Sequence, residues 1–413
     1  MKLVLIIGLG LVLRLISLDQ SLWLDEAITA QVVKKTPIEI VTQFSVADFH
    51  PPTYYWLMAG WSRVCPNSET CLRLPSVVFG LVTIGVIYSL YGTGAGLLVA
   101  VNPLLIYYSQ EARMYSMATM LFVLTWWAVK KEKWVLVNVF SGLALGSFYG
   151  VGLGWAGVNI YWIISKNYKN ILKGNWGVLT VLIILVPLLR EQIKAAGSQL
   201  SGATNWAGAL GKTNLKNLGL IPLKFAIGRV SFYPKIIYWG LGGLWTVIIW
   251  SGLVVNKTWK KAEVIIILLT VLVGIIVSIK VPMMSYFRFI YLLPLTLAML
   301  PKNWWLVTGF TAWSLFYLLV DSQHREDWKS ASHSLGGNQV YMISTFGDPV
   351  NFYRPEIKVK DIRGEIEGDV IEVIPYGQEI HGLNHNQILV NKNYKRVKQT
   401  NLRGMVTESW QKN

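Results

Sequence analysis

The sequence contains few charged residues and almost no cysteine. Asp, Glu, Lys and Arg make up only 15% of its 413 residues, whereas soluble domains contain about 25%. Hydrophobic residues make up 53% of the chain, and Trp and Tyr occur 19 times each, as expected for the aromatic belts at membrane interfaces. The composition excludes an ordinary soluble domain and predicts a polytopic α-helical membrane protein.

Sequence motifs for metals, nucleotides and dinucleotides are also missing. The chain has no H-E-x-x-H, no cysteine pair with zinc spacing, no P-loop and no G-x-G-x-x-G of the dinucleotide type. We therefore predict no cofactor, and a divalent metal has no support from the sequence. Cys65 and Cys71 are the only cysteines. The sequence leaves two alternatives for them: a disulfide, which an oxidising compartment would permit, or two free thiols.

Acidic residues are scarce in the apolar part of the chain. Residues 1–320 carry 26 Lys and Arg but only 10 Asp and Glu, whereas residues 321–413 carry 12 of each kind. A basic membrane domain suits anionic lipid headgroups and phosphate ligands. Because the basic residues occur in short loops between apolar runs, nucleic acid is not predicted as a partner.

Apolar segments recur along the chain and predict about eleven transmembrane helices. They are residues 3–18, 71–90, 93–108, 113–129, 134–150, 151–165, 175–190, 236–255, 263–280, 285–300 and 303–320. Counting them places Lys2 and four lysine-containing loops on one side, which the positive-inside rule makes the cytoplasm. Eight of the ten acidic residues in 1–320 and the C-terminal tail then lie outside. The external loop 191–235 is basic, in contrast with this rule.

The first external loop predicts interfacial helices rather than a span. The run from Thr36 to Glu39 is a capping box that begins a short amphipathic helix. Pro51 disfavours a helical conformation at His50, so a turn is expected there. An interfacial helix is predicted over residues 52–64.

The chain is predicted to divide into a transmembrane domain, residues 1–320, and a small soluble α/β domain outside the membrane, residues 321–413. In the second domain a helix is expected to run from Trp328 to Leu335. Short β-like runs follow at residues 339–344, 370–374 and 387–390.

Two acidic motifs in the first external loop are candidate sites. Asp25 and Glu26 are neighbours, and on a helix neighbours point about 100° apart, so only one is expected to face a site. An external carboxylate beside the bilayer can act as a general base toward a hydroxyl or an amine; a solvated pair is the alternative. In the D-F-H-P-P turn, His50 could donate to a phosphate or orient a carboxylate. The alternative is a polar turn capped by Asp48.

Two further motifs lie at the outer ends of predicted spans. Glu111 and Arg113 occur in Y-Y-S-Q-E-A-R-M-Y, and Arg288 opens a span in Y-F-R-F-I-Y. Arginine can bind a phosphate in fork geometry; the alternative is a side chain that reaches lipid headgroups. Ionisable groups in membrane proteins are functional candidates by default. Since all four motifs fall on one predicted membrane face, they favour a reaction on a lipid-phosphate substrate.

The order of these motifs resembles the GT-C glycosyltransferases, most nearly the bacterial protein-mannosyltransferase and aminoarabinose-transferase-like group. The resemblance covers about residues 15–330. It is carried by S-L-W-L-D-E-A, D-F-H-P-P-T-Y-Y-W, L-R-L-P-S-V-V-F-G, N-P-L-L-I-Y-Y-S-Q-E-A-R-M-Y-S, F-R-F-I-Y-L-L-P-L and R-E-D-W-K-S-A. It implies a monosaccharide donor linked to polyprenyl phosphate and a protein, lipid or envelope-glycan acceptor. It also implies an active site on the outer face of the cytoplasmic membrane.

The resemblance implies roles for particular residues. Asp25 would be the general base, with Glu26 as the neighbouring catalytic carboxylate. Donor binding is implied for Asp48, His50, Glu111, Arg113 and Arg288. Cations would stabilise the leaving polyprenyl phosphate, and a single displacement would invert the anomeric carbon.

Two other functions compete with a glycosyltransferase. A transporter or flippase of lipid-linked sugars would need polar groups along a path to the cytoplasmic face, and the sequence shows few. A non-catalytic membrane scaffold that presents residues 321–413 would keep its function when Asp25 is replaced by asparagine.

Overall fold

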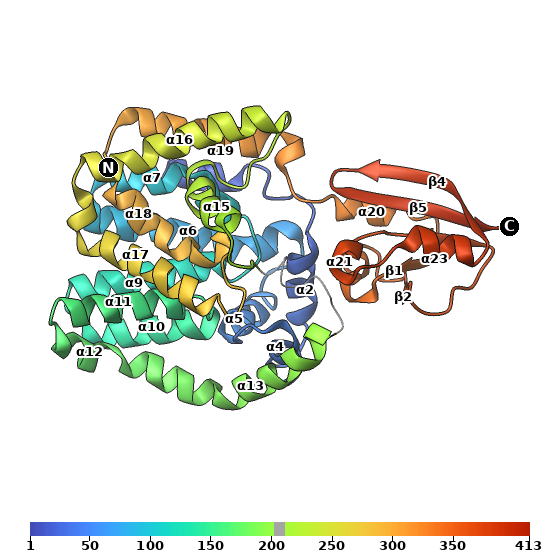
Figure 1. Cartoon of the computed structure of the whole chain (residues 1–413), viewed down its shortest axis with the longest axis horizontal. Coiled ribbons are helices and arrows are strands. Elements are labelled where there is room, and N and C mark those ends of the chain that lie inside the picture. Colours follow the sequence, from blue (N-terminus) through green and yellow to red (C-terminus); the bar gives the residue numbers. More distant parts are fainter. Residues whose placement is uncertain (202–210) are drawn as a thin grey trace.

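The computed structural model describes residues 1–201 and 211–413, which form two parts (Figure 1). Most helices of the first part run along the long axis of the molecule, and the part with the β-sheet lies at one end of them. Each part buries an apolar core of its own. The predicted boundary at residue 320 itself stays a prediction.

The helices of the first part follow the predicted apolar segments. These helices are α1 (Lys2–Leu15), α6 (Glu69–Tyr91), α7 (Thr93–Val101), α8 (Pro103–Ser109), α9 (Tyr115–Lys130), α10 (Trp134–Ser147), α11 (Val151–Ile164), α13 (Trp176–Ser201), α16 (Lys235–Val255), α17 (Ala262–Val277), α18 (Leu293–Met299) and α19 (Trp304–Leu319). Two helices were not predicted, α12 (Tyr168–Gly174) and α15 (Leu215–Ile227). Among the described residues, three helices, α6, α13 and α16, are long and apolar enough to cross a membrane. The predicted count of eleven spans is therefore not confirmed.

Two predicted spans are interrupted. The segment 93–108 breaks at Asn102, where the side-chain oxygen accepts from the amides of Leu104 and Leu105 and Pro103 lacks an amide proton. The segment 285–300 begins as a 3₁₀ helix, η3 (Tyr286–Leu292), and becomes α18 only afterwards. Asn102 caps the second helix in the first case, whereas in the second case α18 has no side-chain cap and only a proline in its first turn.

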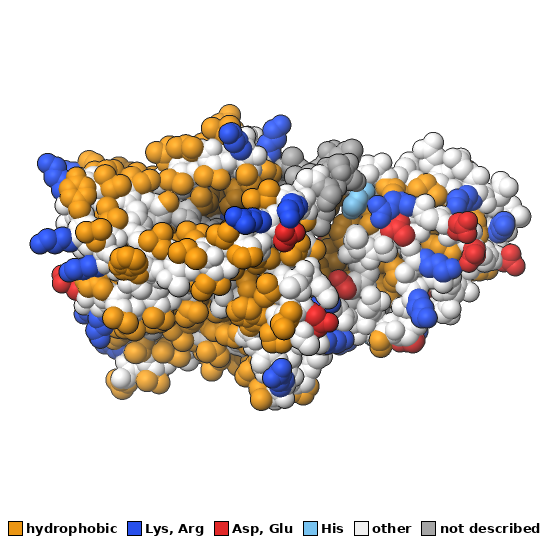
Figure 2. Space-filling view, turned by 90° about the horizontal axis from the view of Figure 1, so that it is seen from below, with side chains coloured by type: hydrophobic (Ala, Val, Ile, Leu, Met, Phe, Trp, Pro, Cys, Tyr) orange, Lys and Arg blue, Asp and Glu red, His pale blue; other side chains and the backbone are white. Residues whose placement is uncertain are grey.

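The surface of the helical part is largely apolar. Figure 2 shows hydrophobic side chains over most of this face, with Lys and Arg scattered around them at the end farther from the sheet and also nearer to it. Such an extended apolar surface is typical of a protein that sits in a membrane.

The first external loop folds as short helices, as predicted. The predicted ones are α3 (Pro37–Glu39), the π-helical turn η1 (Ile40–Phe44), α4 (Ser45–Asp48) and α5 (Thr53–Trp61). The loop also contains α2 (Leu24–Val32), which was not predicted. The capping box is confirmed: Thr36 accepts from the Glu39 amide, and the Glu39 carboxylate accepts from the Thr36 amide. The turn predicted at His50 is also present, because Phe49 adopts a left-handed conformation with φ of 56° and ends α4.

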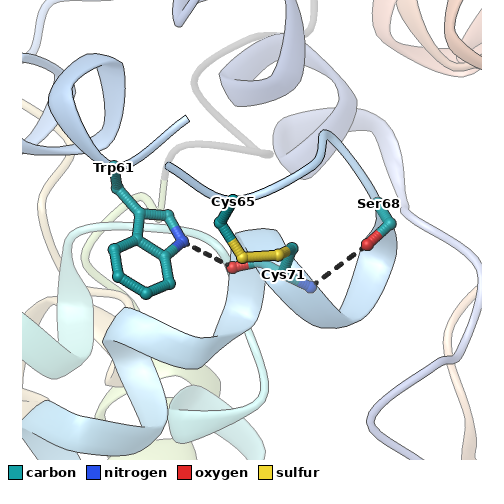
Figure 3. The surroundings of a disulfide bond; sticks show 4 residues. All are labelled: Trp61, Cys65, Ser68 and Cys71. Carbon is teal, nitrogen blue, oxygen red and sulfur yellow. Dashed lines mark hydrogen bonds between the residues drawn. A yellow bond between two sulfur atoms is a disulfide. The ribbon is translucent and has the colours of Figure 1, made fainter. Parts of the chain in front are cut away.

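Cys65 and Cys71 form a disulfide between α5 and α6 (Figure 3), with 6.0 Å between their Cα atoms. Trp61 donates from its indole to the carbonyl of Cys71 at 2.8 Å, and Ser68 caps α6 by accepting from the Cys71 amide. Of the two alternatives left by the sequence, the structure therefore has the disulfide. It closes the connection that leads from the first external loop into α6.

The second part is a small α/β unit around one mixed sheet with strand order β2-β1-β3-β5-β4. Its elements are α20 (Trp328–His333), β1 (Gln339–Met342), α21 (Asp348–Tyr353), β2 (Val359–Asp361), β3 (Val370–Val373), α22 (Gln378–His381), α23 (His385–Asn391), β4 (Tyr394–Leu402) and β5 (Met405–Lys412). β1 pairs in parallel with β2 and β3, whereas β5 is antiparallel to β3 and β4.

The strand prediction in this part is correct for β1 and β3 and wrong for residues 387–390. That run lies in α23, whose start is capped by Asn384 accepting from the Gln387 amide. A four-residue apolar run has no period by which a helix and a strand can be told apart. Strands β2, β4 and β5 were not predicted.

Helices α10 and α13 touch backbone to backbone at one glycine. A Cβ atom built on Gly177 would lie 1.8 Å from the carbonyl oxygen of Asn138, and the Gly177 amide donates to the Asn138 side chain at 2.8 Å. Alanine at this position must push the two helices apart, because neither backbone can yield locally.

We expect Gly177→Ala to destabilise the protein by about 1–3 kcal/mol, the usual cost of overpacking. The thermal unfolding midpoint in detergent measures the effect. Gly85→Ala on α6 is the matched control, since a Cβ there meets nothing within 4 Å and alanine favours the helix. An equal loss in both variants would contradict the close approach at Gly177.

Candidate active site

The structure brings Asp25, Asp48, His50 and Arg113 together at the end of the helical part that faces the sheet. Asp25 lies in the first turn of α2, and Arg113 lies in the connection between α8 and α9. Arg113 Nη2 is 3.7 Å from Asp25 Oδ2, and its Nη1 is 3.9 Å from Asp48 Oδ2. The guanidinium is 3% exposed, whereas 29% of the Asp25 side chain is accessible. Asp25 is therefore a solvent-accessible carboxylate beside a buried cation.

Asp48 is held on its other sides by His50 and Tyr55. His50 Nδ1 lies 2.7 Å from Asp48 Oδ2, and the Tyr55 hydroxyl donates to the same oxygen at 3.0 Å. Arg113 donates to the Tyr55 hydroxyl at 3.0 Å. Burial alone would raise the pKa of Asp48, but His50 and Arg113 outweigh it and hold that pKa below its usual value. Asp48 is thus an ionised carboxylate whose Oδ2 atom lies beside His50, Tyr55 and Arg113.

Glu26 points away from Asp25 into the protein, as neighbours on a helix should. Its carboxylate is fully buried and accepts two hydrogen bonds from Arg73, at 2.8 and 2.6 Å. The amide of Ala112 donates to the same carboxylate at 2.8 Å. Burial raises the pKa of Glu26, but Arg73 and Arg325 outweigh it and leave the pKa below its usual value. Glu26 therefore binds Arg73 and the backbone at Ala112, and its buried carboxylate has no access to a substrate.

Glu111 and Arg288 lie outside the Asp25 cluster. Glu111 is buried and paired with Arg325 at 3.4 Å, and its Oε1 atom has no hydrogen-bond partner. Burial raises the pKa of Glu111 to about 7, although Arg325 opposes the effect. The half-buried Arg288 donates to the carbonyl of Pro282 and stacks near the Phe287 ring. Among the described residues no ion pair joins Arg288 to the predicted site carboxylates.

A cavity of about 220 Å³ opens where the two parts of the chain meet. It is lined by Trp23, Tyr107, Arg229, Ser231, Ser322, Gln323, His324, Arg325 and Glu326. Trp23 immediately precedes α2, and Asp25 and Arg229 both act electrostatically on half-buried Glu326. The cavity therefore adjoins the Asp25 cluster.

Arg229 is the cation in this cavity that stays open to a ligand. Its guanidinium lies 5.4 Å from the Trp23 ring and 5.1 Å from the Tyr107 ring, and it donates to the Tyr107 hydroxyl. No carboxylate of the described residues lies within 4.0 Å of it, whereas Arg325 is paired with Glu26 and Glu111. Aromatic contacts orient a guanidinium without neutralising its charge.

The sequence motifs missed several residues of this site. Tyr55 and Arg73 lie within motifs that carried the family resemblance, in Y-Y-W and L-R-L-P, and Arg325 lies in R-E-D-W. The only sequence feature that pointed to Arg229 was the unusual positive charge of loop 191–235. In the described residues no three His, Cys, Asp or Glu side chains are grouped so that they could hold a metal ion.

Comparison with known proteins supports the resemblance over part of the chain. The family model for dolichyl-phosphate-mannose-protein mannosyltransferases matches residues 49–191. This segment contains His50, Tyr55, Arg73 and Arg113, whereas Asp25 lies before it. No curated protein matches the chain.

Two solved structures of ArnT from Cupriavidus metallidurans align with 98% of this chain and 97% of their own. The apo form has a TM-score of 0.49 and 12% identity, and the form bound to undecaprenyl phosphate has 0.48 and 14%. The family match confirms the predicted resemblance to GT-C glycosyltransferases for residues 49–191 and agrees with a multi-pass membrane protein.

Proposed function

We propose that this chain is a membrane glycosyltransferase that takes a monosaccharide from a polyprenyl-phosphate donor and passes it to an acceptor outside the cytoplasmic membrane. The observation that carries the proposal is the pairing of accessible Asp25 with buried Arg113, at 3.7 Å, within and beside a segment matched by the mannosyltransferase family. The name of that family specifies a sugar donor linked to a lipid phosphate.

Asp25 is the proposed general base. An acceptor hydroxyl or amine gives its proton to the Asp25 carboxylate while the oxygen or nitrogen bonds to the anomeric carbon. The bond from that carbon to the phosphate oxygen breaks, and the lipid phosphate leaves with the electron pair. A single displacement of this kind inverts the anomeric carbon. Arg113, which lies between Asp25 and Asp48, holds the base in place.

Arg229 is the proposed ligand of the donor phosphate. Its guanidinium faces the cavity beside α2, is oriented by two aromatic rings, and has no carboxylate partner within the described part of the chain. Arg113 is less suited than the sequence suggested, because two carboxylates already neutralise it. Stabilisation of a leaving phosphate requires a cation whose charge is still available.

We expect Arg229→Gln to raise the KM for the lipid-phosphate donor about tenfold or more, the usual cost of losing one hydrogen bond to a charged group. Initial rates at varied donor concentration measure it. Lys216→Gln, a change of the same charge at an exposed position on α15, is the control. An unchanged KM would contradict the assignment of the donor phosphate to Arg229 and would leave Arg288 as its candidate ligand.

The proposal is tested by incubating membranes that contain the protein with a panel of radiolabelled polyprenyl-phosphate sugars. Transfer of label to a lipid, glycan or protein fraction, absent from membranes without the protein, is the expected result. Movement of intact labelled lipid across vesicles without transfer would favour the transporter instead.

A further inference from the structure

The junction between the two parts of the chain is built around Arg325, whose side chain is 2% exposed. Its Nη2 atom donates to the carbonyl of Tyr107 at 3.3 Å and to the Glu111 carboxylate at 3.4 Å. Its Nε atom lies 3.6 Å from the carboxylate of Glu26. One guanidinium therefore bridges two buried carboxylates that lie on different segments.

Both carboxylates lie next to the proposed reactive pair. Glu26 follows Asp25 on α2, and Glu111 precedes Arg113 by two residues. The amide of Ala112, between Glu111 and Arg113, donates to Glu26. A shift of the backbone that carries either carboxylate would therefore change the 3.7 Å separation of Asp25 and Arg113.

The backbone of Arg325 is held from both parts of the chain. Its amide donates to the side-chain oxygen of Gln20 at 3.3 Å, and its carbonyl accepts from Arg403 Nε at 2.8 Å. Arg403 lies in the turn between β4 and β5. Arg325 thus connects the β4–β5 hairpin to the carboxylates beneath α2.

A second set of contacts ties the same region together. The Leu22 amide donates to the Tyr353 hydroxyl at 2.7 Å, and Lys329 pairs with Glu69 at 3.0 Å. In Figure 1, α20 and α21 accordingly lie at the end of the sheet unit that faces α2. Arg325 differs from these contacts because it alone reaches the buried carboxylates.

We propose that Arg325 is a positioning residue through which the C-terminal part of the chain holds Asp25 and Arg113 in their reactive arrangement. The inference rests on the proposed function only in naming that pair as reactive. A movement of the β4–β5 hairpin would then be transmitted to α2 through this side chain.

Hydrogen exchange tests the coupling without an activity assay. The proteins compared are wild type, Arg325→Lys, Arg325→Gln and the control Arg363→Gln, which removes an arginine paired with Asp361 on β2, the edge strand opposite β4. We expect amides of residues 22–32 to exchange at least tenfold faster in Arg325→Gln, with an intermediate rate in Arg325→Lys and no change in the control.

Kinetics test the positioning role. We expect Arg325→Gln to lower kcat at least tenfold with less than a threefold change in donor KM, and Arg325→Lys to restore part of kcat.

The pH profile of the reaction should also move in the Arg325→Gln variant. In the wild type the pKa of Glu111 is about 7, and Arg325 lowers it. Without this arginine the pKa of Glu111 is higher. On acidification the variant therefore loses the ionised form of Glu111 at a higher pH than the wild type does. The charged groups that act on Glu111 are Arg325, Glu26, Arg229 and Asp25.

Unchanged exchange over residues 22–32 in Arg325→Gln would overturn the proposal, as would faster exchange throughout residues 321–413, which indicates unfolding. A kcat equal to that of wild type, or a pH profile identical in both proteins, would also overturn it. If wild type transfers no sugar, the proposed function fails, and the exchange result still decides whether Arg325 couples the two parts.

Discussion

Replacing Asp25 with asparagine is expected to reduce sugar transfer by about 10²- to 10⁴-fold, the range that a positioned general base contributes. Asparagine preserves the shape of the side chain but cannot accept the acceptor's proton. The loss should appear in kcat, because the change removes an interaction made in the transition state and leaves the cavity beside Trp23 and Arg229 intact. Initial rates in membranes matched for protein abundance measure it.

Asp19→Asn is the matched control for this experiment. Asp19 is an exposed acid in the same external segment, and no ion pair is formed by it in the described part of the chain. The control should retain the wild-type rate. If Asp25→Asn also retains it, the base must be another carboxylate, and Asp48 is then the one beside Arg113. Glu26 is not a substitute, because its carboxylate is fully buried against Arg73.

Replacing Arg73 with methionine is expected to lower the free energy of unfolding by about 3–5 kcal/mol, the usual cost of breaking one side of a buried ion pair. Arg73 is fully buried and also donates to the carbonyls of Leu18, Gln20 and Ser21, which precede α2. The variant leaves Glu26 without its closest cation and these carbonyls without a donor. Thermal unfolding in detergent measures the effect.

The control for Arg73 is Arg63→Met, which removes an exposed arginine from the same external region and should change stability by less than about 0.5 kcal/mol. In the double variant Arg73→Met with Glu26→Gln, the loss should be smaller than in Arg73→Met alone, since no uncompensated charge then stays buried. A double variant that is less stable than Arg73→Met would show that the pairing with Glu26 is not the source of the loss.

Local chemistry in the first external loop was readable from the sequence. The capping box at Thr36 and the turn before Pro51 depend on residues within a few positions of one another, so spacing alone predicts them. The same holds for the apolar helices, whose positions agree closely with the predicted segments. Their division into spans was less accurate, because Asn102 and Pro103 end a helix inside one continuous apolar run.

The sequence predicted which residues come together in the site better than it predicted what each of them does. Asp25, Asp48, His50 and Arg113 do come together, although 88 residues separate Asp25 from Arg113 along the chain. Spacing indicated that Asp25 and Glu26 would face different ways, but it could not say which would be buried. That choice depends on Arg73, whose guanidinium is presented by α6 to one carboxylate and not to the other.

By itself the sequence determined the class of the protein, the positions of its apolar helices and the motifs from which the active site is drawn. These follow from composition and short-range patterns, which need no knowledge of packing. Only the tertiary structure decided which cation serves which carboxylate: Arg73 and Arg325 pair with Glu26, and Arg113 lies beside Asp25 and Asp48. Within the described residues, Arg229 has no carboxylate partner. The energy of an ion pair depends on separation and burial, and both quantities arise only when distant segments pack together.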